Sequence, residues 1–275
     1  MGKLDGKVAF ITGAARGQGR SHAVRLAEEG ADIIAVDICR DIESVPYPLA
    51  TPDDLEQTAK AVQVLGRRVV SRQADVRNMG ELQAAVRDGV AELGRLDIVL
   101  ANAGIIGWPL DELDDGDPLV SWKDGIDVSL TGVYLTLRAT VPVLIEQGDG
   151  GAIVLTSSSA GLKGLGADSA GGHAYTAAKH AVVGLMRTYA NSLAQHHIRV
   201  NTVHPTGVNT PMVMNDAMQK YLSEYPDSAR DLTNLLPVQL IEPVDVSNAI
   251  LYLVSEDARY VTGVTLPVDA GITAK

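Results

Sequence analysis

The sequence predicts an α/β fold, a single domain with a doubly wound, parallel, seven-stranded sheet and helices on both faces. Short apolar runs alternate with longer segments of helical periodicity along the whole chain. Such alternation is typical of parallel strands joined by helical crossovers, which cover both faces of the sheet. The 275 residues, 46% of them hydrophobic and 21% charged, suit one large domain with a substantial core.

Seven strands are predicted at the apolar runs 7–12, 31–37, 68–76, 96–104, 151–159, 198–205 and 263–269. Helices are predicted between them, over 19–30, 51–66, 79–93, 119–147, 174–196 and 243–254. The helix over 51–66 carries the clearest signals. Thr51 is a favoured N-cap residue, Pro52 suits a first turn, and Gly66 suits a helix end.

Two long irregular segments interrupt the alternation. The segment 38–54 is unusually long for a strand-to-helix connection, and it predicts either a loop over a site or a tolerated surface insertion. The segment 206–240 contains Met212, Met214 and Met218 among several leucines. These flexible apolar side chains either form a lid over a pocket for an apolar substrate or simply pack the segment onto the domain.

Composition excludes several classes of protein. A net charge of −11 is unsuited to binding nucleic acid, and Cys39, the one cysteine, cannot form an internal disulfide. No cluster has metal-ligand spacing, so no metal site is predicted. The N-terminus lacks the apolar region of a secretory signal, and no apolar run has the length of a membrane span. We therefore expect a cytoplasmic protein with no membrane contact.

A glycine-rich turn, ITGAARGQGR, joins the first strand to the first helix. Gly13, Gly17 and Gly19 would allow the backbone, with Arg16 and Gln18 between them, to approach a pyrophosphate at the helix N-terminus. A plain glycine turn is the alternative, but the strand–turn–helix context favours dinucleotide binding.

The residues at the ends of the next strands indicate which dinucleotide binds. Asp37 ends the second strand, where a carboxylate accepts hydrogen bonds from ribose hydroxyls and repels a 2′-phosphate. Arg16 instead favours a cofactor with a 2′-phosphate, since an arginine can pair with such a phosphate. An arginine can also turn to solvent. The sequence therefore favours NAD. Asp75 and Val76 are expected beside the adenine, and the protein backbone at Asn102, Ala103 and Gly104 is expected to approach the cofactor.

Tyr175 and Lys179 lie four residues apart in a predicted helix and so share one face. The serines of LTSSSAG (155–161) and the segment HPTGVNTPM (204–212) follow strands that open on the same crevice. A nearby ammonium and an oxidised nicotinamide would lower the tyrosine pKa, so that tyrosine removes a hydroxyl proton while a serine holds the substrate oxygen. An accidental Tyr/Lys pair on a helix surface is the alternative.

These motifs, in this order, resemble the short-chain dehydrogenase/reductase family over essentially the whole chain, with TGAARGQG, NAG, YTAAK and GVTLPVDAG as the matching stretches. The resemblance implies a Rossmann-type fold, Tyr175 as catalytic acid/base, and Lys179 as the residue that lowers its pKa and binds the nicotinamide ribose. It implies Ser158 as the catalytic serine, although the register among Ser157, Ser158 and Ser159 stays open. Further cofactor contacts implied by the resemblance are Val128, Pro205, Gly207, Val208 and, at the nicotinamide carboxamide, Thr210.

The chain departs from the family pattern at Ser129, where an asparagine usually helps to hold a water of the proton relay. A serine hydroxyl can bond its own helix backbone instead. The alternative is that Ser129 holds the same water from slightly further away.

The 38–54 segment and HPTGVNTPM also resemble the mycofactocin-coupled, carveol-dehydrogenase-like branch of the family. That resemblance implies tightly held NAD beneath the 38–54 segment and electron transfer to a peptide-derived redox carrier. The family resemblance implies a homotetramer. The predicted function is NAD-dependent interconversion of an apolar, cyclic or terpenoid secondary alcohol and its ketone. Alternatives are a dehydratase or epimerase of this fold, or a non-catalytic NAD-binding regulator.

Overall fold

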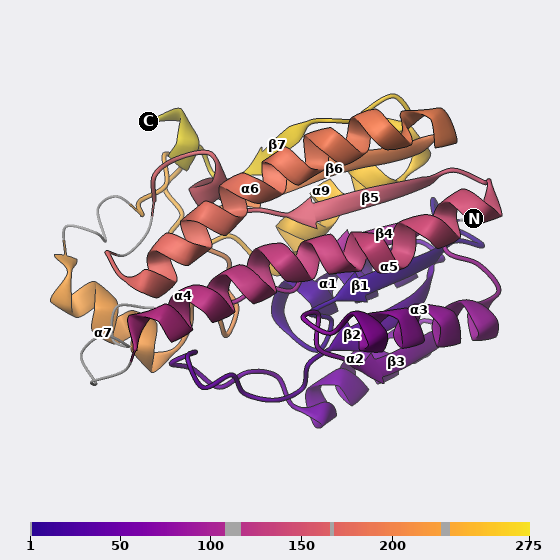
Figure 1. Cartoon of the computed structure of the whole chain (residues 1–275). Helices are drawn as coiled ribbons and strands as arrows, with labels where there is room; N and C mark the ends of the chain where they lie inside the picture. Colours follow the sequence, from indigo (N-terminus) through magenta and orange to yellow (C-terminus); the bar gives the residue numbers. More distant parts are fainter. Residues whose placement is uncertain (1, 108–116, 166–167, 227–231) are drawn as a thin grey trace.

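The computed structural model describes residues 2–107, 117–165, 168–226 and 232–275. Its sheet contains seven strands, all parallel, in the order β3-β2-β1-β4-β5-β6-β7 (Figure 1). The predicted doubly wound sheet is confirmed. The strands are β1 (Val8–Thr12), β2 (Asp32–Asp37), β3 (Val69–Gln73), β4 (Ile98–Ala101), β5 (Gly151–Thr156), β6 (Ile198–Pro205) and β7 (Thr265–Val268).

The strand order reverses at β1, which pairs with β2 on one side and with β4 on the other. Successive crossovers therefore leave β1 and β4 in opposite directions, and a crevice opens between them at the carboxyl ends of the strands. Ligands of doubly wound proteins bind in this crevice.

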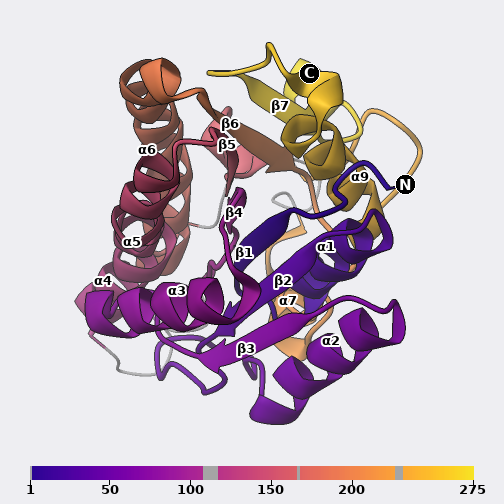
Figure 2. The ribbon, with the colours of Figure 1, turned by 90° about the vertical axis from the view of Figure 1, so that its right-hand side faces the viewer.

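Helices form a layer on each face of the sheet (Figure 2). Neighbouring residues of one strand point to opposite layers, so that Ile33 packs in one core and Ile34 in the other. One layer contains α1 (Gly17–Glu28), α2 (Pro52–Val64) and α9 (Pro243–Val254), and the other contains α3 (Met79–Leu93), α4 (Pro118–Ile126), α5 (Gly132–Gln147) and α6 (Ala170–Leu193).

The helix predicted over 119–147 forms as one run, Pro118–Gln147, with a π-helical turn, Asp127–Thr131, between α4 and α5. Within the described residues, Pro118–Gln147 is the one helix long and apolar enough to cross a membrane. An 18-residue window of this helix has a mean hydropathy of 1.5, but 56% of that window is buried inside the protein. It has the burial of a core helix. π-Turns concentrate at functional sites, and this one carries Ser129.

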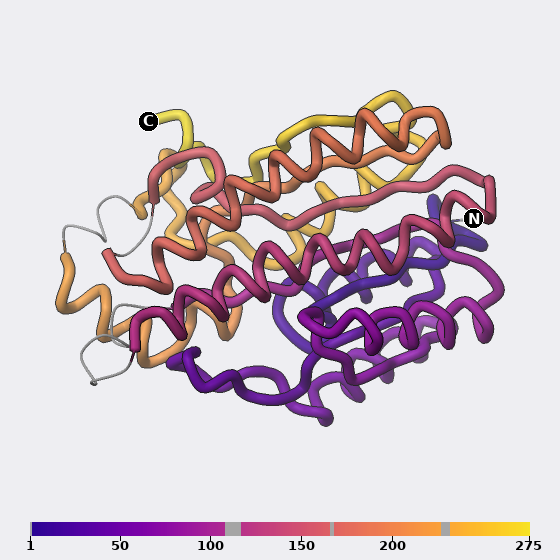
Figure 3. Tube along the Cα trace, in the orientation of Figure 1, coloured from indigo at the N-terminus to yellow at the C-terminus, as the bar shows by residue number. Residues whose placement is uncertain are grey.

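A helix that the sequence did not predict, α7 (Asp216–Glu224), lies within the 206–240 segment. Asn215 caps it by accepting a hydrogen bond from the Met218 amide at 2.8 Å, and Met218 and Tyr221 are buried. Met218 and Tyr221 are three residues apart in the sequence, a spacing that places both on one face of a helix. Figure 3 shows α7 and the segment between β2 and α2 at the end of the molecule where the strands terminate.

Candidate active site

The glycine-rich turn is shaped as a pyrophosphate site requires. Gly13 and Gly17 have φ angles of +66° and +54°, in the left-handed region that favours glycine. A Cβ on Gly19 would lie 1.9 Å from the Gly13 carbonyl oxygen. The N-terminus of α1 has no side-chain cap, so its first amides can bind an anion. The turn therefore fits a dinucleotide phosphate.

Gly19→Ala tests this packing. The added methyl cannot be accommodated without moving the Gly13 carbonyl, so we expect lower thermal stability and at least about tenfold weaker NAD binding. Gly184→Ala is the matched control, because a Cβ there meets nothing within 4 Å. Calorimetric titration and a melting curve measure both effects, and unchanged NAD affinity in Gly19→Ala would contradict the assignment.

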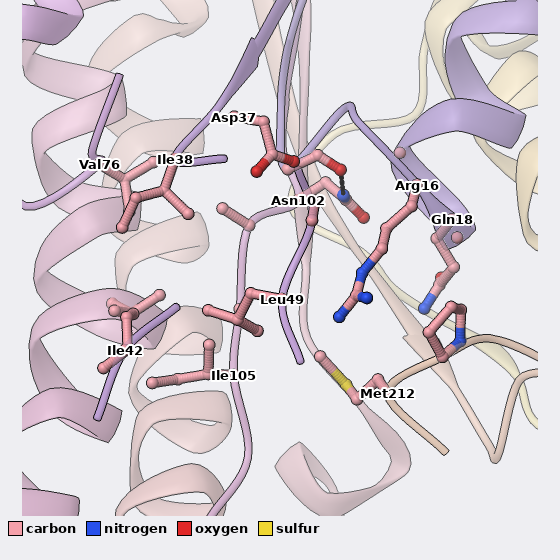
Figure 4. Close-up of a pocket in the computed structure, with 18 of the residues that line it drawn as sticks. Arg16, Gln18, Asp37, Ile38, Ile42, Leu49, Val76, Asn102, Ile105 and Met212 are labelled. Atoms are coloured by element: carbon pink, nitrogen blue, oxygen red, sulfur yellow. Dashed lines mark hydrogen bonds between the residues drawn. The ribbon is translucent and has the colours of Figure 1, made fainter. Parts of the chain in front are cut away.

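A cavity of 140 Å³ lies between this turn, the ends of β2 and β4, and the 38–54 segment (Figure 4). Asp37 is buried in its wall and accepts hydrogen bonds from the amides of Ala15 (3.0 Å) and Cys39 (3.2 Å). Burial raises the pKa of Asp37, and these amides and Arg16 oppose that rise. Asp75, Val76, Ala103 and Val128 also line this cavity.

Arg16 extends from the turn into the cavity (Figure 4). Its guanidinium donates a hydrogen bond to the Pro48 carbonyl at 2.7 Å. The arginine is thus bound to the 38–54 segment. This contact gives Arg16 a role other than pairing with a 2′-phosphate, which was the one signal against NAD in the sequence.

The 38–54 segment is fastened over the cavity at several further points. Arg40 binds Asp75 at 3.1 Å, and the Ser44 hydroxyl donates to Asp124 at 2.7 Å. The buried Tyr47 hydroxyl accepts a hydrogen bond from the Ile106 amide at 3.2 Å. Sequence analysis did not single out Tyr47, since its partner lies 59 residues away.

Asn102 directly follows β4 and bonds to the ends of β1 and β5, where the crevice opens. Its side-chain amide donates to the Thr12 carbonyl at 3.0 Å, and its oxygen accepts from the Thr156 hydroxyl at 3.4 Å. A Cβ added to the nearby Gly104 would lie 3.3 Å from the Lys179 ammonium nitrogen. A side chain there would press on the lysine, which would have to shift by a few tenths of an ångström.

Lys179 is buried, and its Nζ donates a hydrogen bond to the Thr156 carbonyl at 2.7 Å. Burial lowers the Lys179 pKa to about 8. The Nζ atom lies 5.5 Å from the centroid of the Tyr175 ring. In the protein alone, burial raises the pKa of Tyr175, and a hydrogen bond with the Ser158 side chain opposes that rise.

The three consecutive serines have different surroundings. Ser157 is buried, and its hydroxyl donates to the Lys179 carbonyl at 2.8 Å. Ser159 is buried at the start of a 3₁₀ turn. Ser158 is half-buried, and its side chain is close enough to Tyr175 to oppose the rise of the Tyr175 pKa. This geometry favours Ser158 as the serine that meets a substrate.

The Ser129 hydroxyl bonds neither its own helix nor the lysine. It donates to the Ile105 carbonyl and accepts from the Ile105 amide, both at 3.3 Å. The serine thus holds the chain beside Gly104, where a Cβ would lie 3.7 Å from the Ser129 oxygen. This partner was not among the alternatives considered from the sequence.

A second cavity, of 720 Å³, contains Ser158, Tyr175 and Lys179 at its base. Most of its other walls are apolar, and Tyr175 also packs against the cluster of Ala160, Leu165 and Ile272. Sequence analysis missed the wall supplied by the C-terminal Ile272. Pro205, at the end of β6, also lines this cavity. The 206–240 segment contributes Gly207, Val208, Met212, Met214, Met218, Tyr221, Leu222, Leu232, Leu236 and neighbouring residues.

The two cavities share five lining residues: Gln18, Asn102, Gly104, Thr210 and Met212. Among the described residues, Gln18 Oε1 is a buried oxygen with no hydrogen-bond partner. A dinucleotide can therefore run from Asp37 past this amide to Tyr175. The described residues contain no group of three or more His, Cys, Asp or Glu that could hold a metal ion.

Comparison with known proteins identifies the family. A family model described as enoyl-(acyl carrier protein) reductase matches residues 13–273. A protein of Mycolicibacterium smegmatis named as a short-chain type dehydrogenase/reductase is 54% identical over 285 residues, covering 100% of this chain and 99% of that protein. The chain belongs to the short-chain dehydrogenase/reductase family.

Within the short-chain dehydrogenases/reductases, the chain is similar to carveol dehydrogenases, as predicted. The (−)-trans-carveol dehydrogenase of Rhodococcus erythropolis is 53% identical over 283 residues, covering 100% of both chains. The crystal structure of carveol dehydrogenase from Mycobacterium avium in complex with NAD superposes with a TM-score of 0.92 at 50% identity, again covering 100% of both chains.

Proposed function

We propose that this short-chain dehydrogenase/reductase oxidises an apolar cyclic secondary alcohol, such as a terpenoid alcohol, to its ketone with NAD. The observation that carries the proposal is the position of Tyr175, Ser158 and Lys179. They lie where the 720 Å³ apolar cavity meets the residues that it shares with the cofactor cavity. The similarity to carveol dehydrogenases supports the substrate class.

In this mechanism NAD, when bound, supplies the hydride acceptor. Ser158 binds the substrate oxygen, and Tyr175 accepts the hydroxyl proton as the carbinol hydrogen leaves as hydride, so that the alcohol becomes a ketone. The buried Lys179 carries the positive charge that favours the Tyr175 phenolate. The apolar walls exclude water and strengthen that interaction.

Asp37 selects NAD over NADP in this proposal. Its carboxylate is held by two backbone amides and would face the adenosine ribose. A 2′-phosphate would meet this carboxylate directly, while Arg16 is bound to Pro48. The repulsion therefore outweighs any pairing with the arginine.

The 38–54 segment holds NAD tightly in this account, and a peptide-derived carrier receives the electrons. Ile42, Tyr47 and Leu49 of this segment form part of the cofactor cavity, and the Arg40–Asp75 contact fastens it. Release of NAD would require these contacts to open first.

We further propose one domain with 206–240 as a substrate lid, assembly as a homotetramer, and a cytoplasmic location.

Loosening the segment tests this retention. Tyr47→Phe removes the hydrogen bond to the Ile106 amide, so exchange of bound NAD for labelled NAD should become about five- to tenfold faster. Glu43→Gln, at an exposed position of the same segment, serves as control and should leave exchange unchanged. Equal exchange rates in wild type and Tyr47→Phe would count against a closing role.

The function itself is tested with a panel of cyclic secondary alcohols, supplied once with free NAD and once with an artificial redox dye. Bound NAD with turnover only toward the dye supports the carrier-coupled form of the proposal. Empty protein that reduces free NAD supports an exchanging dehydrogenase. Failure to oxidise any alcohol under either condition would contradict the proposed function.

A further inference from the structure

We infer that His204 is a positioning residue for the proposed catalytic serine. His204 is a fully buried residue of β6 that lines neither cavity. Its Nδ1 lies 2.9 Å from the Ser158 carbonyl oxygen, and its Nε2 lies 2.8 Å from the Thr202 hydroxyl. The inference rests on the proposed function, because it concerns the same site.

The hydrogen-bond partners fix the state of the imidazole ring. A carbonyl oxygen can only accept, so Nδ1 carries the hydrogen and donates it to Ser158. In the neutral ring Nε2 then accepts from the Thr202 hydroxyl. Both nitrogens of a neutral imidazole are satisfied in this arrangement, and a fully buried ring needs that satisfaction.

The surrounding charges agree with a neutral ring. Burial lowers the His204 pKa to about 4. Lys179 and His180 on α6 lower it as well, whereas the Ser158 carbonyl and Asp269, after β7, raise it. His204 therefore keeps the same hydrogen bonds throughout the neutral pH range.

The backbone of β6 explains why a side chain, and not a backbone amide, donates the hydrogen bond to the Ser158 carbonyl. The ladder between β5 and β6 ends with the Ser157 amide donating to the Val203 carbonyl at 2.9 Å. Pro205 is the next residue of β6 whose amide would face β5, and it has no N–H, so the ladder goes no further. Beyond this point the His204 side chain, rather than a backbone amide of β6, donates to the Ser158 carbonyl and ties Ser158 to the sheet.

The backbone amides that donate to Ser158 belong to its own turn. Its carbonyl also accepts from the Gly161 amide at 2.8 Å, and its hydroxyl accepts from the Ala160 amide at 3.2 Å. These bonds shape the turn but do not attach it to β6. The imidazole thus fixes where the Ser158 hydroxyl stands relative to Tyr175.

Replacing the imidazole tests the inference. In His204→Leu, Ser158 loses its tether, and we expect kcat for the best alcohol of the panel to fall about 10- to 100-fold while NAD stays bound. A displaced Ser158 side chain no longer holds the Tyr175 pKa down, so that pKa rises and the acid limb of the kcat profile moves to higher pH. His204→Asn places an amide donor near the Nδ1 position and should stay within about threefold of wild type.

A double-variant cycle with Ser158→Ala shows whether His204 acts through the serine. We expect His204→Leu to cost nothing further in the Ser158→Ala background. The same fold-loss in both backgrounds would overturn the inference, whereas full activity of Ser158→Ala alone would overturn the proposed role of that serine. If His204→Leu does not fold, kcat of His204→Asn should be higher than kcat of His204→Gln, and the reverse order would overturn the inference.

Discussion

Tyr175→Phe is expected to lower the rate of alcohol oxidation by about 10²- to 10⁴-fold while NAD remains bound. The substitution removes one oxygen atom, the one that accepts the substrate proton. The ring packs against Ala160, Leu165 and Ile272, and phenylalanine keeps those contacts. The loss should therefore appear in kcat and not in thermal stability.

Tyr189→Phe is the matched control for this variant. Tyr189 lies on the same helix and is also partly buried, but it lines neither cavity. Its removal should leave turnover close to wild type. Turnover retained by Tyr175→Phe in the presence of bound NAD would refute the assignment of Tyr175 as the base.

Lys179→Met is expected to lower turnover on the order of 10²-fold at neutral pH, because the charge that favours the Tyr175 phenolate is lost. The Tyr175 pKa then rises further, so the acid limb of the rate profile moves to higher pH. Some activity should return as the pH is raised. Rate profiles of wild type and variant between pH 6 and about 10 measure this shift.

The stability of Lys179→Met should respond in the opposite sense from its activity. The Lys179 pKa is about 8 in the folded protein, below its usual 10.5, so the unfolded chain binds the proton more strongly. Stability therefore rises with pH between about 8 and 10.5, and below pH 8 the charged lysine costs at most about 3 kcal/mol. Methionine avoids that cost, although it leaves the Thr156 carbonyl without this donor.

We therefore expect the Tm of Lys179→Met at pH 7 not to fall below that of wild type. Lys60→Met, at an exposed position of α2, controls for the general effect of losing a positive charge. A large fall in Tm together with the loss of activity would indicate a structural role for Lys179 instead.

The sequence predicted the parts of the molecule that depend on local patterns. All seven strands form, and Thr51 caps α2 in a capping box with Asp54, as its residue type indicated. The predicted strands 68–76, 96–104 and 151–159 end three residues early, at Gln73, Ala101 and Thr156. In each case the remaining three residues line a cavity at the carboxyl ends of the strands.

The parts that could not be predicted depend on contacts between distant segments. Tyr47 meets Ile106 only in the folded chain, and the C-terminal Ile272 packs in one cluster with Tyr175. Ser129, in the π-turn, likewise bonds Ile105, 24 residues earlier. No local pattern marks such partners, since each residue is ordinary in its own segment.

Transfer of deuterium from the carbinol carbon tests the central claim most directly. Protein containing NAD is mixed with an alcohol of the panel that carries deuterium on that carbon, denatured after a single turnover, and its nucleotide is weighed by mass spectrometry. We predict reduced nicotinamide that carries the deuterium in wild type and none in Tyr175→Phe. Ketone formed without deuterium in the nucleotide, or no ketone with any alcohol of the panel, would contradict the account.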